Sequence, residues 1–255
     1  MNRPKKVNEI LEEQINTAVN EYERSNFRLL VSAFAAGLEI GFSVFLIAVL
    51  FSQFHDQISS PYLHLILSLA YPIGFIFVII GRSELFTEHT TLAVLPVLNR
   101  VSSIMDLLQL WGIILIGNLV GGYIIGLLLT YVAPNLGIIE SSSFVYIASE
   151  ILHHSNLTIL GSAIMAGWLM GLLSWLVASA QETISRIFLI IMVTATIGMG
   201  GLHHSIVGSI EVFTGMLNSS DINIVDYFRF QSVAIFGNAI GGVFFVAIVK
   251  YGQKR

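Results

Sequence analysis

The chain has 255 residues, of which 55% are hydrophobic and 11% charged, and its formal net charge at pH 7 is −4. Soluble domains carry about 25% charged residues, so this apolar surplus, with a mean hydropathy of +0.81, exceeds what one soluble core buries and indicates a membrane protein. The sequence contains no cysteine, which excludes disulfides and thiolate metal sites. It also has no basic patch or aromatic RNA-binding motif, so we expect no nucleic-acid partner.

The first 26 residues are polar, with Ile10, Leu11, Ile15 and Val19 at helical spacing. This spacing predicts an amphipathic helix on the membrane surface, and the alternative is a frayed tail. No short apolar core follows the basic start, so we do not expect a cleaved signal peptide.

Six apolar stretches follow, each at least about as long as the ~20 residues that a helix needs to cross the hydrocarbon. Five of them overlap intervals that lack Asp, Glu, Lys and Arg, and the first is interrupted by Arg28 and Glu39. The predicted spans are roughly 27–51, 61–80, 104–132, 157–180, 185–217 and 225–249. We therefore predict a cytoplasmic amphipathic segment (1–26), a single transmembrane domain (27–250) and a cytoplasmic tail (251–255).

The basic residues are distributed unevenly about these spans. The side of the membrane that carries the N-terminus has ten of them: Arg3, Lys5, Lys6, Arg24, Arg28, Arg100, Arg186, Lys250, Lys254 and Arg255. The other side has Arg229, and Arg82 lies at membrane depth. By the positive-inside rule, we expect both termini to be cytoplasmic in a protein of the cell (inner) membrane.

The two halves of the chain resemble each other. A Ser-Ala-x-x-Ala-Gly-x-x-x-Gly motif occurs at 32–41 and again at 162–171, and Gly-Asn-x-x-Gly-Gly occurs at 117–122 and at 237–242. One repeat, about 27–132, is three spans, so the second, about 157–249, must lie inverted in the membrane. Inverted repeats with broken helices at matching positions are typical of transporters, with the substrate site near the midplane.

Each repeat contains a polar break in its middle span, at residues 81–89 and 198–205. Irregular backbone at membrane depth is tolerated only where it is buried in protein or lines a cavity. Each break also creates half-helix ends, and the free N–H groups of a half-helix N-terminus favour an anion. The breaks are therefore the predicted functional centre of the chain.

Histidine is the side chain in these breaks that best suits a transport site. An imidazole donates a hydrogen bond or exchanges a proton near neutral pH. His203 and His204 are adjacent, so they point in different directions, and we expect one of them to line the path. The alternative is a hydrogen-bonded packing residue.

Charged residues also occur at membrane depth, where they are costly. We expect Arg82 to pair with Glu84 and Glu88 near the cytoplasmic mouth, in preference to a direct role with substrate. Glu39 and Glu211 likewise need partners or water; Arg82 and Arg28 are candidates.

Four apolar residues flank the first break. Tyr71 and Phe75 share one face of the second span, and Leu85 and Phe86 lie within the break. Together they predict a constriction that excludes hydrated ions, and aromatic core packing is the alternative.

Six spans as two triplets, the Leu85-Phe86-Thr87 motif and the Gly-x-x-His motif that ends at His204 resemble the formate/nitrite transporter family, in a less studied branch. The resemblance covers nearly the whole chain after residue 27. It implies an all-α, aquaporin-like protomer with broken helices two and five, and a homopentamer in the lipid bilayer. It also implies that His204 is the central histidine and that Thr87 faces it, with Leu85, Phe86, Tyr71 and Phe75 at the constriction.

The predicted function is passage of a small monovalent weak-acid anion, namely formate, nitrite, lactate or hydrosulfide, linked to a proton through the central histidine. The first alternative is a pore for small neutral solutes such as water, ammonia or hydrogen sulfide. A membrane enzyme or metal site built from His203, His204, Glu84 and Glu88, and a non-conducting scaffold or sensor, are the others. We expect no enzyme activity, no cofactor and no bound metal, because no His–Glu spacing forms a recognised metal motif.

Overall fold

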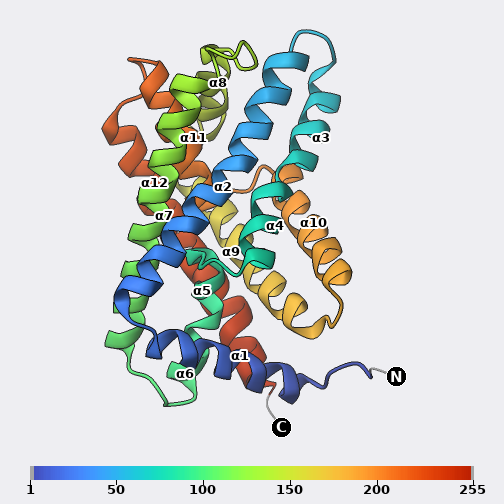
Figure 1. Ribbon diagram of the computed structural model, residues 1–255, viewed down its shortest axis with the longest axis vertical. Helices are drawn as coiled ribbons and strands as arrows, with labels where there is room; N and C mark the ends of the chain where they lie inside the picture. Colours follow the sequence, from blue (N-terminus) through green and yellow to red (C-terminus); the bar gives the residue numbers. More distant parts are fainter. Residues whose placement is uncertain (1–2, 254–255) are drawn as a thin grey trace.

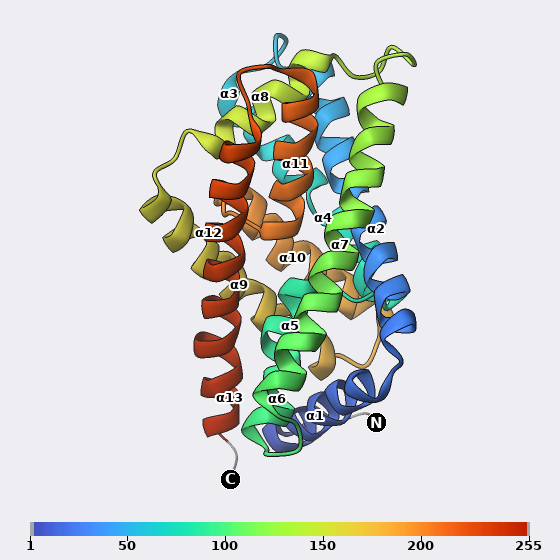
Figure 2. The same ribbon diagram turned by 90° about the vertical axis from the view of Figure 1, so that its left-hand side faces the viewer.

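The computed structural model describes residues 3–253, which form helices and irregular segments without a β-strand. The predicted surface helix is present as α1 (Val7–Glu23), at one end of a bundle of helices (Figures 1 and 2). The bundle consists of α2 (Asn26–Phe54), α3 (Ser60–Ala70), α4 (Pro72–Gly81), α5 (Phe86–Leu92), α6 (Val94–Leu98), α7 (Ile104–Val132), α8 (Ser141–Leu152), α9 (Asn156–Ser179), α10 (Thr183–Met199), α11 (Ser205–Asn218), α12 (Ile224–Gly242), the π-helix η1 (Val243–Ile248) and α13 (Val249–Gly252).

Within the described residues, five helical segments are long and apolar enough to cross a membrane. They are Asn26–Phe54, Ser60–Gly81, Ile104–Val132, Asn156–Ser179 and Ile224–Gly252. The stretch that the sequence predicts as one further span, 185–217, is divided between α10, of 17 residues, and α11, of 14 residues. The glycine-rich break, which was predicted at 198–205, ends α10 at Met199. Each of the two helices is therefore shorter than the ~20 residues of a typical membrane span.

Helix α8 was not predicted from the sequence. It lies at the end of the bundle opposite α1 and packs against α11 (Figure 1). Its buried face is short and consists of Ser143, Phe144, Ile147 and Ala148, and its 12 residues are fewer than the ~20 that a membrane span needs. This helix covers one side of the site described below.

The two long helix pairs α2–α7 and α9–α12 approach each other through matching glycines. A Cβ atom on Gly37 would lie 2.2 Å from the carbonyl oxygen of Asn118, and one on Gly167 would lie 2.1 Å from that of Asn238. Only glycine allows backbones so close, as small-xxx-small motifs do in membranes. In both views α2 and α7 run away from the α1 end, whereas α12 runs towards it, so the described chain ends lie at the same end of the bundle (Figures 1 and 2).

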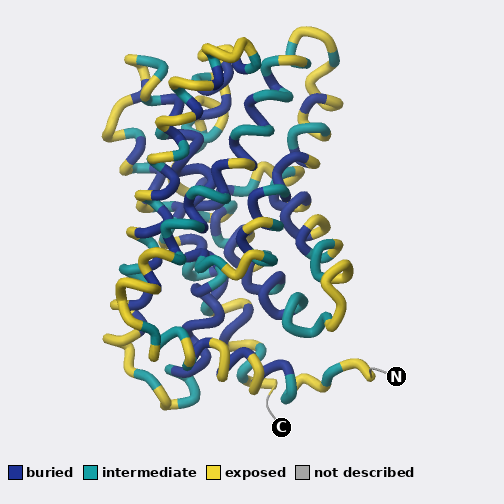
Figure 3. The backbone as a smooth tube through the Cα atoms, viewed as in Figure 1, coloured by how far each residue is buried: buried dark blue, intermediate teal, exposed yellow. Residues whose placement is uncertain are grey.

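The outer surface of the bundle exposes large apolar side chains, as lipid contact requires. Phe27, Leu157, Ile184 and Phe236 are each more than 60% exposed, and the buried residues lie inside the bundle (Figure 3). A soluble monomer rarely leaves so much apolar surface open to water. Two of the basic residues that predict a cytoplasmic C-terminus, Lys254 and Arg255, lie outside the described residues, as do Met1 and Asn2.

Pro72 interrupts the helix between α3 and α4 and places Tyr71 at the bend. Proline removes one N–H donor and frees a carbonyl in the preceding turn. Ser43 of α2 bridges the gap, because its Oγ donates to the carbonyl of Tyr71 at 2.6 Å and accepts from the N–H of Gly74 at 2.9 Å. The bend is therefore fixed, and with it the position of Tyr71 and Phe75.

Candidate functional site

The first break follows α4, which ends at Arg82 in the left-handed conformation with φ of 62°. The chain is then irregular to Leu85, and α5 begins at Phe86. Asn118 of α7 holds this junction: its Oδ1 accepts from the N–H of Phe86, and its Nδ2 donates to the carbonyls of Ala33 and Glu84, all at 2.8 Å. The amide thereby satisfies polar backbone that has no water at this depth.

The second break repeats this arrangement. Gly201 has φ of 56°, and α11 begins at Ser205. The Oδ1 of Asn238 accepts from the N–H of Ser205 at 2.8 Å, and its Nδ2 donates to the carbonyls of Ala163 at 2.8 Å and His203 at 3.0 Å. The sequence displays the Gly-Asn motif, but it does not indicate that each asparagine acts as a clamp, the side chain that binds the backbone of one break.

His204 lies between the two breaks and caps α11. Its Nδ1 accepts the backbone N–H groups of Ile206 and Val207, each at 3.3 Å, and its Nε2 lies 2.8 Å from the Oγ1 of Thr87. An accepting Nδ1 requires the proton on Nε2, so the neutral ring donates to Thr87. Protonation of Nδ1 would break the cap, so this geometry favours the neutral imidazole.

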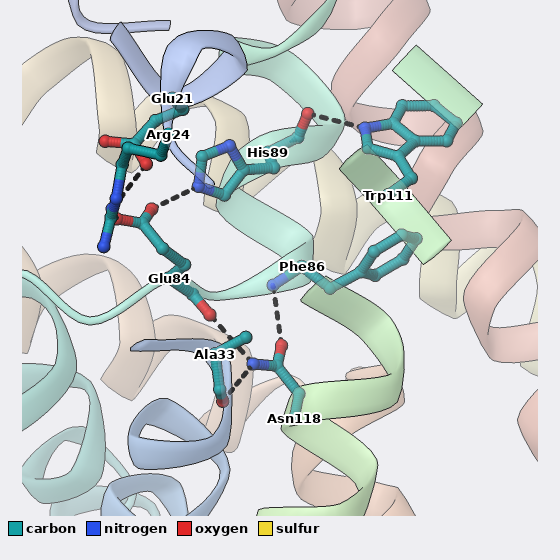
Figure 4. Close-up of polar contacts among 8 residues, drawn as sticks. All are labelled: Glu21, Arg24, Ala33, Glu84, Phe86, His89, Trp111 and Asn118. Atoms are coloured by element: carbon teal, nitrogen blue, oxygen red, sulfur yellow. Dashed lines mark hydrogen bonds and ion pairs between the residues drawn. The ribbon is translucent and has the colours of Figure 1, made fainter. Parts of the chain in front are cut away.

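Aromatic rings cover the imidazole. The ring of Phe75 meets His204 edge-on, with centroids 5.2 Å apart and an interplanar angle of 88°, and Tyr71 stacks on Phe75 at 5.3 Å. Leu85 is fully buried. The ring of Phe86 lies against that of Trp111 on α7, with centroids 5.9 Å apart (Figure 4). The predicted apolar group is therefore divided, with Tyr71 and Phe75 at the histidine and Phe86 directed toward α7.

Two cavities approach this contact from opposite ends of the bundle. The α8-side cavity, of about 300 Å³, has His204, His203, Tyr71 and Glu211 among its lining residues. The α1-side cavity, of about 320 Å³, is lined by residues that include Glu13, Gln14, Glu21, Arg82, Glu84, Glu88 and Arg186. Thr87 lines neither cavity and is fully buried, so the Thr87–His204 contact closes the α8-side cavity at its His204 end.

The charged loop is arranged differently from the sequence prediction. Glu84 is bound by Arg24, at 2.7 Å, and by the Nε2 of His89, at 2.6 Å, and not by Arg82 (Figure 4). Arg82 has no ion pair within the described residues; it ends α4 and its exposed side chain lines the α1-side cavity beside Glu88. Arg24 replaces it because the turn between α1 and α2 places its guanidinium directly against the loop.

The same guanidinium joins α1 to the break. Arg24 also binds Glu21 at 2.5 Å. Burial alone would lower the pKa of Arg24, but its bonds to Glu21 and the charges of Glu21 and Glu84 raise it. Burial, with the charge of Glu84, raises the pKa of Glu21 against the bond from Arg24. Glu21 therefore depends on Arg24 for compensation, whereas Glu84 shares Arg24 with His89.

Glu39 also has a different neighbour from those expected. Its carboxyl hydrogen-bonds Ser83, and its Oε2 is buried without a partner. Within the described residues, neither Arg28 nor Arg82 forms an ion pair with it, and both lie at exposed positions.

His203 faces away from the central contact. Its Nδ1 lies 2.7 Å from the Oγ of Ser162, which also accepts the N–H of His203 at 2.9 Å, and its ring meets that of His154 edge-on at 5.2 Å. Within the described residues, no group of three or more His, Cys, Asp or Glu side chains is arranged to hold a metal ion. The adjacent histidines thus point in different directions, and His204 is the one at the centre.

Comparison with known proteins agrees with this geometry. A family model described as Formate/nitrite transporter matches residues 8–252. The inner membrane protein YfdC of Escherichia coli (strain K12) is 34% identical over 92% of this chain and 74% of that protein.

Two solved structures share the fold. One, described as an FNT family ion channel, has a TM-score of 0.87 at 20% identity and covers 96% of this chain and 99% of that chain. The other, a pentameric formate channel with formate bound, has a TM-score of 0.76 at 22% identity and covers 89% and 96%. The resemblance read from the two breaks is confirmed: this multi-pass membrane protein belongs to the formate/nitrite transporter family.

Proposed function

We propose that this protein is a channel or transporter for small monovalent weak-acid anions, with formate as the first candidate and nitrite, lactate and hydrosulfide as further ones. The observation that carries the proposal is the contact between His204 and Thr87, 2.8 Å long and buried between two cavities. A relative of the same fold is described as a pentameric formate channel with formate bound.

In this mechanism, the anion enters a cavity and loses its water at the aromatic cover of His204. A bare anion meets a steep desolvation barrier at that depth, so the solute crosses as the neutral acid or together with a proton. The N–H on Nε2 of His204 and the hydroxyl of Thr87 replace part of the lost hydration. Because Nδ1 is occupied by the cap of α11, the imidazole stays neutral and orients the solute, and the proton travels with the solute.

We further propose six membrane crossings arranged as two inverted three-helix repeats, about 27–132 and 157–249, with both termini in the cytoplasm. The matching clamps of Asn118 and Asn238 support the repeat. The opposite directions of α7 and α12 support its inversion, and the position of both described chain ends at one end of the bundle supports an even number of crossings (Figure 2).

The assembly that we propose is a homopentamer with one pore per protomer. The support is the shared fold with a channel described as pentameric and the apolar outer surface, part of which would pack against neighbouring copies. Native mass spectrometry of the detergent-solubilised protein tests this: five copies are expected, and a monomer in every mild detergent would contradict it.

A pore for small neutral solutes is the second candidate, and the charges of the cavities favour it. Glu150 and Glu211 line the α8-side cavity, whose described lining residues include no Lys or Arg, and four glutamates outnumber Arg82 and Arg186 in the α1-side cavity. Such linings repel anions. Swelling of proteoliposomes in neutral solutes, compared with formate, separates the two functions.

The direct test is a flux panel of formate, nitrite, lactate, acetate and hydrosulfide into proteoliposomes at an acidic and a neutral external pH. We expect uptake of at least one of these solutes to rise as the external pH falls, and His204→Ala to change its rate. Uptake that is unaffected by both pH and His204→Ala would contradict the mechanism. Zero flux for every solute would favour a scaffold or sensor.

A further inference from the structure

Glu211 is a buried carboxylic acid that the mechanism above does not use. It lies on α11, its side chain is 9% exposed, and it lines the α8-side cavity. Within the described residues, no hydrogen bond or ion pair reaches its carboxyl group; Thr214 donates only to its backbone carbonyl. An unpartnered carboxylate in such a place is costly and is a functional candidate.

Glu211 shares a helix face with the central histidine. His204, Gly208 and Glu211 all line the α8-side cavity, at the i, i+4 and i+7 spacing that puts residues on one side of a helix. Seven residues of helix rise place Glu211 about 10 Å from His204 along the axis of α11. Glu211 therefore lines the same cavity as His204 at a position farther along α11.

The other ionisable groups of the cavity do not neutralise this carboxyl. Those on the remaining elements are His64, Tyr71, Tyr146, Glu150, His154, His203 and His204, and the described lining includes no Lys or Arg. Arg229, on α12, is directed to the carbonyls of Leu152 and His154 and to Asn156.

The remaining neighbours of α11 place their ionisable groups elsewhere. The hydroxyl of Tyr227 on α12 contacts Ser209 and Tyr123. Glu39 on α2 contacts Ser83, Asp106 begins α7 near the α1 end, and Glu88 and His89 on α5 lie towards the α1-side cavity.

The protonation state of Glu211 therefore changes the electrostatic energy of an anion in the α8-side cavity. When ionised, it adds a like charge next to the path of an anion, in a cavity without a fixed positive charge. When protonated, it adds no charge and its O–H group can donate a hydrogen bond to the anion. His204 does not supply such a switch of charge, because its Nδ1 is engaged in the cap of α11 and the ring stays neutral.

We propose that Glu211 is a titratable charge filter, which excludes a weak-acid anion from the α8-side cavity while ionised and admits it once protonated. The inference rests on the proposed passage of small weak acids and assigns the residue that sets its pH dependence. The substitutions below separate the effect of Glu211 from that of the other ionisable groups in the cavity.

The experiment compares formate uptake by full-length wild-type and Glu211→Gln protein in proteoliposomes over a range of external pH. The ratio of the two rates cancels the pH dependence of formic acid in bulk water and of the histidines. Because Gln resembles the protonated acid, the ratio should be near one at low pH and should rise about tenfold per pH unit above the pKa of Glu211. Glu211→Asp should keep the wild-type profile.

Glu140→Gln is the matched control, since Glu140 begins α8 at the same end of the bundle but does not line the cavity. Its ratio to wild type should not change with pH. A ratio for Glu211→Gln that is flat with pH overturns the inference, as does loss of formate uptake in a Glu211→Gln protein that still forms the wild-type oligomer. Absence of uptake by the wild type would instead contradict the proposed function itself and the filter with it.

Discussion

Single side chains fix the centre of this molecule through hydrogen bonds to backbone. Asn118 and Asn238 each use both amide atoms to bind three backbone groups across a break. His204 uses Nδ1 in the same way, and this leaves only its Nε2–H for Thr87 or a solute. The position and the protonation state of the imidazole thus follow from one capping interaction.

Removal of either clamp should destabilise the protein. Asn238→Ala leaves the N–H of Ser205 and the carbonyls of Ala163 and His203 without partners in a buried place, where each unsatisfied group costs about 1–3 kcal/mol. We expect a lower unfolding temperature in detergent and slower transport. Asn135→Ala is the control, because Asn135 is exposed and binds only the carbonyl of Tyr131; equal melting of the two variants would refute the role of the clamp.

Several residue-scale features were predictable and others were not. The sequence indicates His204 and Thr87, because each belongs to a motif in a break. It does not reveal Arg24 as the partner of Glu84, since 60 residues separate them and nothing in a single sequence pairs one arginine with one glutamate. The direction of the Phe86 ring depends on Trp111, which carries no signal of its own.

Two kinds of contact position the helices of this fold. The long helices meet in pairs through close backbone contacts, and α1 packs across one end of the bundle. The α9–α12 pair meets at Gly167, and the α2–α7 pair at Gly37. Helix α1 packs on α6 and α9, and its residue Tyr22 donates to the carbonyl of Ala93 at 2.7 Å. The repeated small-residue motifs contain the glycines of these contacts, and a break in the fifth span was predicted at 198–205, whereas the pairing of the helices and the presence of α8 needed the structure.

The close approach gives a prediction with a control on the same helix. Gly167→Ala places a methyl group 2.1 Å from the carbonyl oxygen of Asn238, and such overpacking costs about 1–3 kcal/mol. Gly161→Ala meets nothing within 4 Å and should be neutral or stabilising. Thermal unfolding in detergent measures the stability of both variants. Equal unfolding temperatures for Gly167→Ala and Gly161→Ala would contradict the prediction, because they would show that α9 and α12 move apart at little cost.

Arg24 provides the corresponding prediction for α1. Arg24→Ala removes the bonds to Glu21 and Glu84, leaving Glu21 without its cation and Glu84 with His89 alone, at a cost of about 1–3 kcal/mol for the attachment of α1. Hydrogen exchange of the α1 amides should accelerate at neutral pH. Because burial raises the pKa of Glu21, acidification should neutralise it and reduce the difference from wild type. Arg3→Ala, at an exposed ion pair with Glu9, should change exchange little.

At the scale of the whole molecule, two cavities end at a buried contact between the two breaks. The membrane class and the family follow from apolar stretches and paired motifs, which a sequence displays directly. The cavities and their acidic lining do not, because they arise from elements that meet only in the folded chain. The central claim about this contact is that the solute and a proton cross it together.

The most direct measurement records formate uptake and internal pH at the same time, in proteoliposomes with no imposed membrane potential. The account predicts that internal acidification accompanies uptake, that both increase as external pH falls, and that His204→Ala changes both together. Formate uptake that carries no proton and is driven by membrane potential alone would contradict it.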